Sequence, residues 1–169
     1  MRVIVVTAGG DDLVPRVWRL CEAGAEVLVR ESALPAGLPL DRVILHARMP
    51  GAGEVAAALH LPDGADVAAW RARFRGPLSV SAHDVADAHA ALAAGADTVW
   101  LSPIFAARHG RPARGTAGLG GLVALGGVLP EHLPACRAAG AVGVAVLGGV
   151  WDAPDPVAAF GRYRAALSG

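Results

Sequence analysis

The 169-residue sequence is poor in cysteine and in charged residues, and each shortage narrows the possibilities. Its two cysteines, Cys21 and Cys136, lie far apart and form no paired motif, which argues against a disulfide framework and suits thiols in a reducing compartment. Charged residues make up 18%, and 15 basic residues balance 15 acidic ones. This zero net charge gives no electrostatic reason to expect nucleic acid or an anionic membrane as a partner.

The sequence also lacks an apolar run long enough to cross a membrane. The mean hydropathy is +0.45, but the most apolar stretches, 117–129 and 141–151, are short and interrupted by glycine. A spanning helix needs about 20 apolar residues in a row. No charged segment with a cleavage site precedes the first apolar run, so we expect no secretory signal. These absences predict a cytoplasmic protein that folds as one domain over residues 1–169.

What the sequence does contain is a series of short runs rich in β-branched residues. The runs are apolar on both faces, which is typical of strands in a parallel sheet that is covered on both sides. There are eight of them: Val3–Thr7, Glu26–Arg30, Arg42–Arg48, Ala57–Pro62, Pro77–His83, Asp97–Phe105, Val123–Val128 and Val142–Val150.

Alanine-rich helical patterns separate several of these runs. Four of the patterns, Leu13–Ala23, Asp66–Arg75, Asp84–Ala94 and Pro130–Ala139, are each followed at once by glycine, and Asp155–Leu167 closes the chain. Glycine commonly ends a helix. The order strand, helix, glycine, strand indicates repeated βα units.

Eight βα units predict a (β/α)₈ TIM barrel, for which about 250 residues is typical. The chain is shorter, and the deficit falls in three places. Residues 31–41 are too few and too broken by proline and glycine for a helix, 49–56 allow about two turns, and 106–122 are rich in glycine and proline and favour a loop. We therefore expect an abbreviated barrel with about two outer helices shortened or missing. A flavodoxin-like open sheet is the alternative. Missing helices could expose apolar strand faces, so we also expect a homo-oligomer that covers them.

In such a barrel the active site lies where the strands end. Two glycine pairs, Gly126-Gly127 and Gly148-Gly149, follow the seventh and eighth runs. Glycine lets backbone N–H groups approach a ligand, and phosphate commonly binds after these two strands. We predict a phosphate site there, with tight-turn chemistry as the alternative.

Other strand-end side chains are candidates for substrate binding. Arg30, Arg48 and Ser81 stand at the ends of the second, third and fifth runs. An arginine in the mouth of a barrel suits a second anionic group. For Arg30, a structural ion pair with Glu31 or a neighbour is the alternative.

Histidines are the candidate bases. His83 ends the fifth run, and His109 lies in a basic loop, Arg108-His109-Gly110-Arg111, after the sixth. His109 is predicted as a general base or a phosphate contact, with an exposed loop histidine as the alternative. The histidines show no spacing typical of a zinc site, and no metal site is expected.

These residues resemble the thiamin phosphate synthase/TenI family, and the match follows the chain in order. The matching segments are Val27-Leu28-Val29-Arg30-Glu31, Leu59-His60-Leu61, Ser79-Val80-Ser81-Ala82-His83, Gly95-Ala96-Asp97-Thr98-Val99 with Ser102-Pro103-Ile104-Phe105, Gly118-Leu119-Gly120-Gly121-Leu122, Ala124-Leu125-Gly126-Gly127-Val128 and Gly143-Val144-Ala145-Val146. They resemble the family's QLREK, GVHLG, GxSxH, GADYVxxGPIF, GLEGL, AIGGI and GVAV.

The resemblance implies a barrel of thiamin biosynthesis that binds a phosphorylated thiazole, with the phosphate on the two glycine pairs. Synthases of the family join this thiazole to a pyrimidine diphosphate and use Mg²⁺ on the diphosphate. The TenI branch includes thiazole tautomerases, which transfer a proton and need no metal.

The sequence departs from the synthase pattern where Mg²⁺ and diphosphate bind. Ser32 replaces a lysine, Ala47 stands where synthases carry an aspartate, and Asp66 lies one position late for a second carboxylate. Mg²⁺ prefers oxygen ligands. The histidine for which tautomerases are known corresponds to Pro103.

Three hypotheses remain open. The leading one is a TenI-like protein that transfers a proton without a cofactor, with His109 as base and His83 behind it. The second is a diverged synthase that uses Mg²⁺, and the third is a non-catalytic barrel that binds a phosphorylated ligand.

Overall fold

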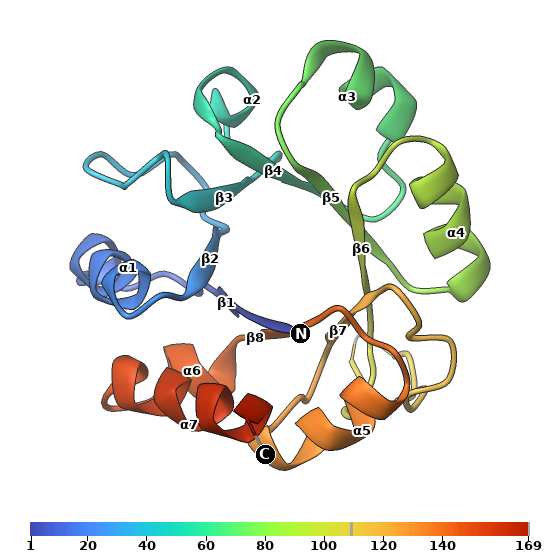
Figure 1. Ribbon diagram of the computed structural model, residues 1–169. Coiled ribbons are helices and arrows are strands. Elements are labelled where there is room, and N and C mark those ends of the chain that lie inside the picture. Colours follow the sequence, from blue (N-terminus) through green and yellow to red (C-terminus); the bar gives the residue numbers. More distant parts are fainter. Residues whose placement is uncertain (109, 169) are drawn as a thin grey trace.

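The computed structural model describes residues 1–108 and 110–168, and in them eight parallel strands close into a barrel (Figure 1). The strands are β1 (Arg2–Val6), β2 (Glu26–Val29), β3 (Val43–His46), β4 (Ala58–Leu61), β5 (Leu78–Ala82), β6 (Thr98–Leu101), β7 (Val123–Leu125) and β8 (Gly143–Val146). Each strand pairs with its neighbours in sequence, and β8 closes on β1 with Val5 opposite Val146. This closure confirms the predicted TIM barrel and excludes the open sheet.

The helices lie around the outside of the barrel (Figure 1). They are α1 (Leu13–Glu22), α2 (Ala52–Val55), α3 (Val67–Arg73), α4 (Val85–Ala93), α5 (Leu133–Ala138), α6 (Gly148–Trp151) and α7 (Pro156–Ser168), and a 3₁₀ turn at Pro130–His132 precedes α5. Between β2 and β3 there is no helix, α2 has four residues, and the described residues between β6 and β7 form no helix. The predicted abbreviation is confirmed. Within the described ranges, no helix is long and apolar enough to cross a membrane.

The two longest predicted strands extend furthest past the observed ones, and β7 also ends early, at Leu125 rather than Val128. The run Val142–Val150 is not one strand, because β8 ends at Val146 and α6 begins at Gly148. The sixth strand ends at Leu101, before a cis peptide bond between Ser102 and Pro103. In both places the sequence stays apolar beyond the strand. Apolarity alone cannot tell a strand from a short buried helix, as after β8, or from a buried loop, as after β6.

The outer faces of β2 and β3 are buried although no helix lies between them. Val29 and Leu45 are both fully buried in the main core cluster, which also contains Leu38 and Met49 from the connecting loops. Leu34 packs against the same cluster. Between β2 and β3, loop side chains therefore cover the apolar strand faces that a missing helix could have exposed. The homo-oligomer stays a prediction.

A second, smaller cluster fills the inside of the barrel. It consists of Ile4, Val6, Leu28, Trp100, Val123 and Ala145, which come from alternate positions of five strands. Trp100 is 1% exposed and lines a cavity at each end of the barrel, one of about 150 Å³ where the strands begin and one of about 260 Å³ where they end.

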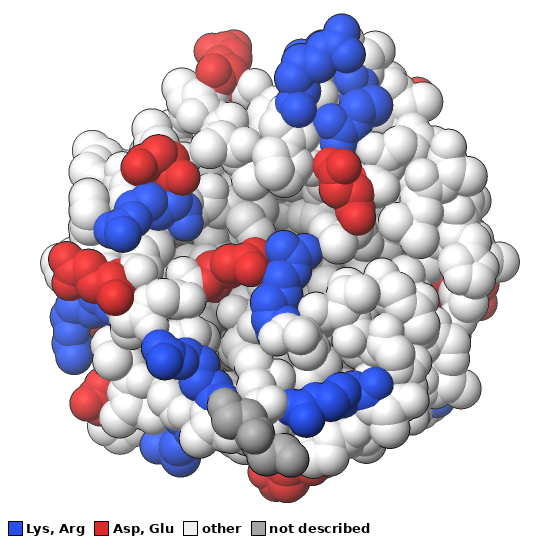
Figure 2. Space-filling view, in the orientation of Figure 1, with Lys and Arg blue, Asp and Glu red and all other residues white. Residues whose placement is uncertain are grey.

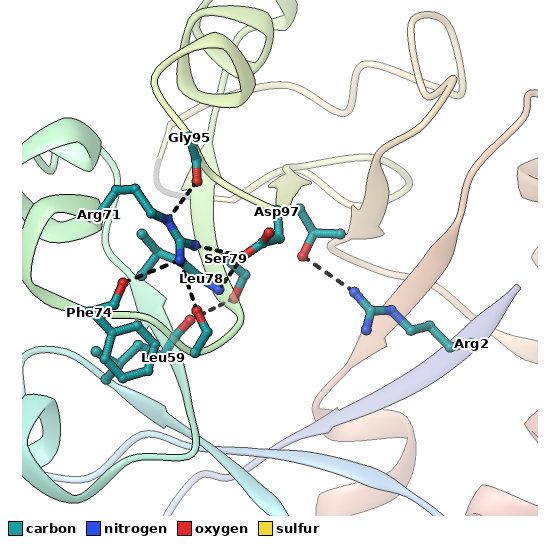
Figure 3. Close-up of polar contacts among 10 residues, drawn as sticks. Arg2, Leu59, Arg71, Phe74, Leu78, Ser79, Gly95 and Asp97 are labelled. Atoms are coloured by element: carbon teal, nitrogen blue, oxygen red, sulfur yellow. Dashed lines mark hydrogen bonds and ion pairs between the residues drawn. The ribbon is translucent and has the colours of Figure 1, made fainter.

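Polar contacts tie together the end of the barrel at which the strands begin. Acidic and basic side chains lie side by side over the centre of the barrel in Figure 2, and Arg2 donates hydrogen bonds to Glu26 at 3.0 Å and Thr98 at 3.3 Å. Figure 3 shows Arg71 at this end, where it donates to Asp97 at 2.6 Å. Interactions at this end of a TIM barrel commonly serve stability, and the active site lies at the other end.

Candidate functional site

A cavity of about 260 Å³ opens where the strands end, and polar side chains from five strands or the loops that follow them meet in it. It is lined by Val6, Leu28, Arg30, His46, Arg48, His60, Pro62, Asp63, Ser81, His83, Trp100, Ser102, Arg108, Leu125, Gly126 and Leu147. A larger hollow of about 480 Å³ lies against α7, but its lining is mainly apolar and it receives no strand end. The mouth cavity is the candidate site because convergent polar groups are what a ligand site requires.

His60 lies on the cavity wall, and both of its ring nitrogens are hydrogen-bonded to serine hydroxyls. Its Nδ1 and Nε2 atoms each lie 2.8 Å from a serine hydroxyl, those of Ser79 and Ser81 respectively. Ser79 donates to the carbonyl of Leu59 at 3.2 Å, so His60 Nδ1–H donates to Ser79 and Ser81 donates to Nε2. Both ring nitrogens are satisfied. His60 is a positioning residue, and it leaves the lone pairs of Ser81 as acceptors toward the cavity.

His46 and His60 are held in the neutral form. Burial, and then the charges of Arg48 and Arg30, lower the pKa of His46 to about 4. Burial, and then His46 and Arg30, lower the pKa of His60 to about 3. His46 Nδ1 accepts the backbone N–H of Arg48 at 3.2 Å, which leaves the proton of the neutral ring on Nε2. Neither ring therefore adds positive charge to the cavity near neutral pH.

His83 has the geometry of a general base. Its Nδ1 lies 2.9 Å from the carbonyl oxygen of Ser102, which can only accept, so Nδ1 carries the proton. The free lone pair of the neutral ring is then on Nε2, and Nε2 lies 3.8 Å from the carboxylate of Asp63. This fixes the tautomer and offers a negative partner to the protonated ring. The structure brings His83 into the cavity as predicted.

Arg30 and Arg48 point their charge into the cavity without a partner on the protein. Among the described residues, neither guanidinium takes part in a hydrogen bond or an ion pair. Glu31, the expected alternative partner of Arg30, instead accepts from the hydroxyl of Thr7 at 2.6 Å and from the N–H of Gly9 at 3.1 Å. An unpaired arginine is available for a ligand anion. The geometry thus favours the ligand-binding role predicted for Arg30 over a structural pair.

The first glycine corner lies at the cavity wall. Gly126 and Gly127 have φ of 101° and 70°, a backbone conformation that favours glycine. Gly126 lines the cavity, and its carbonyl accepts the N–H of Phe105 at 2.8 Å. A Cβ on Gly126 would lie 3.1 Å from Cα of Pro103. These glycines therefore also allow close packing against the loop that follows β6.

The second glycine corner begins α6 beside the first. Gly148 and Gly149 follow Leu147, and β7 and β8 are adjacent in the barrel. Tyr163 joins the corners, because its hydroxyl donates to Val128 at 3.0 Å and occupies the space where a Cβ of Gly149 would stand. The structure brings the two corners to the same side of the barrel, but of the four glycines only Gly126 is among the residues that line the cavity.

Most of the carboxylates near the cavity are engaged by other groups of the protein. Asp66 caps α3 by accepting the N–H of Ala69 at 2.9 Å, and Glu31 is engaged by Thr7 and Gly9. Asp63 is the one carboxylate among the described residues that line the cavity. No group of three or more His, Cys, Asp or Glu side chains in the described ranges could hold a metal ion. Mg²⁺ is commonly held by one or two carboxylates together with substrate phosphates, and Asp63 is the one such carboxylate that the described lining residues supply.

His109, the first candidate base, lies outside the described residues, so its predicted role stays a prediction. The structure adds residues with polar side chains that the sequence analysis did not assign to a role in the site, among them His46, His60, Asp63, Trp100 and Ser102. Asp63 lies two residues after β4 ends at Leu61, so the strand-end rule could have found it. Trp100 faces the inside of the barrel from β6, and Ser102 is the first residue after that strand. Inward and outward positions look alike in runs that are apolar on both faces.

No family model matches the chain. A thiamine-phosphate synthase of Xanthomonas campestris is 37% identical over 164 residues, which cover 89% of this chain and 76% of the relative. One from Salinispora tropica is 34% identical over 169 residues, covering 93% of this chain and 76% of the relative. The chain belongs to the thiamine-phosphate synthase family. A thiamine-phosphate synthase of Geobacillus thermodenitrificans is 38% identical over 102 residues, which cover 53% of this chain and 46% of the relative.

Solved structures agree on the fold of this family member. A thiamine phosphate pyrophosphorylase from Pyrococcus furiosus matches with a TM-score of 0.78 and 18% identity, covering 99% of this chain and 95% of that structure. The family expected from the sequence motifs is therefore confirmed by the relatives, and the barrel by the structural match.

Proposed function

We propose that the protein acts in thiamin biosynthesis and joins a thiazole phosphate to a pyrimidine diphosphate at the barrel mouth. The relatives support this synthase alternative over the tautomerase that led the sequence analysis, because those matched over most of the chain are named thiamine-phosphate synthases. The observation that carries the proposal is that Arg30 and Arg48, which have no partner among the described residues, both line the cavity at the strand ends. Such a pair suits a substrate with a strongly negative leaving group.

In the proposed reaction the thiazole nitrogen forms a bond to the exocyclic methylene carbon of the pyrimidine. The carbon–oxygen bond to the diphosphate breaks, and the diphosphate leaves with the electron pair. Charge grows on the leaving oxygen in this step, so guanidinium groups that already point into the cavity stabilise the transition state more than the ground state. Ser81 offers lone pairs for a substrate N–H, because its own hydrogen is donated to His60.

The phosphate of the thiazole is proposed to bind at the glycine corners. Gly126 stands on the cavity wall. The backbone N–H groups of Gly127 and Gly148 donate to no described residue. Free N–H groups of this kind are donors for a phosphate. This placement puts the monophosphate on the β7–β8 side of the mouth and leaves Arg30 and Arg48, after β2 and β3, for the diphosphate.

The test is formation of thiamin phosphate. The purified protein is incubated with both substrates, and thiamin phosphate and pyrophosphate are measured by mass spectrometry. We expect both products in equal amounts, and we expect Arg30→Ala to lower kcat/KM at least tenfold. Binding of thiazole phosphate with no product under any condition contradicts the synthase and leaves the non-catalytic barrel.

Proton transfer on the thiazole is a second candidate, and one observation favours it. The neutral ring of His83 carries its proton on Nδ1 and its lone pair on Nε2, and Asp63 lies 3.8 Å from Nε2, where it balances the charge of the protonated ring. This arrangement suits abstraction of a proton and its return to another atom of the same substrate. Isomerisation of the thiazole tautomer by the protein alone, followed by NMR, tests it.

A further inference from the structure

The charges of the mouth cavity are unbalanced toward the positive. Arg30, Arg48 and Arg108 line it, and Asp63 is the one acidic residue among the described lining residues. The two histidines beside the arginines are neutral near pH 7, as shown above. The protein pairs other arginines with carboxylates, as in Arg16 with Asp12 at 2.8 Å. Arg30 and Arg48 have no such partner among the described residues, and both line the cavity.

The two unpaired guanidinium groups line the same cavity as His46, and the positive charge of each lowers the pKa of that histidine. The backbone of Arg48 is also tied to His46, because its N–H donates to His46 Nδ1 at 3.2 Å. Arg30 is fixed in the same way at its own backbone, where its N–H donates to the buried Thr7 hydroxyl at 3.0 Å. Two like charges held near each other repel, and an anion that contacts both removes this repulsion.

Two of the carboxylates near this place are engaged elsewhere, which leaves Asp63 as the one acidic residue among the described lining residues. Asp66 serves as the helix cap of α3, and Glu31 holds the Thr7 hydroxyl and the Gly9 N–H. Ala47, between the two cavity residues His46 and Arg48, has no oxygen ligand to offer. The positions that face a ligand anion after β2 and β3 therefore carry guanidinium groups.

We infer that this site holds the diphosphate of its substrate through arginine guanidinium groups and needs no bound divalent cation. The inference rests on the proposed function for the identity of the diphosphate. Arginine matches phosphate oxygens with two parallel N–H groups and keeps its charge at all working pH values. Arg30 and Arg48 thus neutralise the leaving diphosphate, the task for which the family resemblance implies Mg²⁺.

Calorimetric titration of the protein with inorganic pyrophosphate tests this directly. We expect the dissociation constant in excess EDTA to lie within about threefold of the value in Mg²⁺. Arg30→Ala and Arg48→Ala should each weaken binding at least about tenfold, since each removes a charge-assisted contact. Arg48→Lys keeps the charge but loses the paired N–H geometry, and it should recover part of this loss.

Arg162→Ala is the matched control. Arg162 is exposed on α7 and lines none of the cavities described above, so this change removes the same charge at a distance. It should leave pyrophosphate binding within about twofold of the wild type. Thermal melts of all variants confirm that each is folded at the temperature of the titration.

Three results would overturn the inference. One is pyrophosphate binding that is lost in EDTA and restored by Mg²⁺, and another is tight binding of Mg²⁺ alone. The third is inorganic phosphate binding as tightly as pyrophosphate, which would assign the arginines to a monophosphate. Failure of the proposed function looks different. Metal-independent pyrophosphate binding without thiamin phosphate formation would contradict the proposed reaction and support the inference. Turnover that occurs only with Mg²⁺ would support the proposed reaction and contradict the inference.

Discussion

The Nδ1 atom of His83 lies 2.9 Å from the carbonyl oxygen of Ser102, and this contact joins the ends of β5 and β6. Because a carbonyl cannot donate, the contact fixes the proton on Nδ1 and leaves Nε2 as the base. The tautomer of a candidate catalytic group is thus set by the backbone of the neighbouring strand.

This relationship separates the two candidate functions. Proton transfer by a positioned base contributes about 10² to 10⁴-fold to a rate. If the protein is a tautomerase, His83→Gln should lower isomerisation at least about 100-fold, measured by NMR. Formation of thiamin phosphate needs no proton at this position and should fall less than about tenfold. His89→Gln on the exposed side of α4 is the control and should change neither rate.

Asp66 is predicted to stabilise α3 and to take no part in binding. Its side chain accepts the N–H of Ala69 at 2.9 Å. Asp66→Ala should lower the free energy of unfolding by about 1 kcal/mol, a common cost of losing a helix cap. Asp66→Ser keeps a capping oxygen and should lose little. Urea denaturation measures both effects.

The same two variants decide whether Asp66 can be a Mg²⁺ ligand after all. As a cap alone, it can be replaced by serine with no effect on pyrophosphate binding in either EDTA or Mg²⁺. A Mg²⁺-dependent loss of affinity in Asp66→Ser, with stability unchanged, would contradict the role assigned to it.

Much of the barrel could be predicted because each βα unit is encoded locally. Glycine follows α1 and α4 at Gly24 and Gly95, and both glycines have positive φ, 86° and 105°. A helix end of this kind is visible in the sequence because it depends on one residue. The length of β8 was not predictable in the same way, because Val150 is buried in α6 as deeply as a strand residue would be.

The site was predictable where it depends on the position at which a strand ends. Arg30, Arg48, Ser81 and His83 all line the cavity as the strand-end rule predicts. The rule cannot show which side chains near the site already have a hydrogen-bond partner on the protein. That Arg30 is unpaired follows from the hydrogen bonds of Glu31 to groups far from it in sequence.

The buried histidines predict a loss of stability in mild acid. The pKa of His46 is lowered to about 4 and that of His60 to about 3. An unfolded histidine titrates near 6.5, so between these values the unfolded chain binds more protons than the folded one. Stability is therefore full above pH 6.5 and falls as the pH drops, by at most about 1.4 kcal/mol per pH unit for each histidine.

Urea denaturation at several pH values between 4 and 6.5, a window taken from these pKa values, measures this slope. His60→Gln should make it shallower, whatever it does to stability at neutral pH. His89→Gln, at an exposed position, should leave the slope unchanged. An unchanged slope in His60→Gln would mean that His60 does not stay neutral in the folded protein.

Gly149 is predicted to be needed for packing as well as for any ligand. A Cβ at this position would overlap the hydroxyl of Tyr163, which donates to the carbonyl of Val128 at 3.0 Å and is buried. Gly149→Ala should therefore lower the free energy of unfolding by about 1 to 3 kcal/mol, the usual cost of overpacking.

Gly161 in α7 is the control position. It has no atom within 4 Å of an added Cβ, so Gly161→Ala should be neutral or stabilising by up to about 1 kcal/mol. Tyr163→Phe removes the overlapping oxygen, and in that background Gly149→Ala should cost less. If the two glycine variants prove equally stable, then Tyr163 does not lie against the second glycine corner, and the joining of the two corners is lost with it.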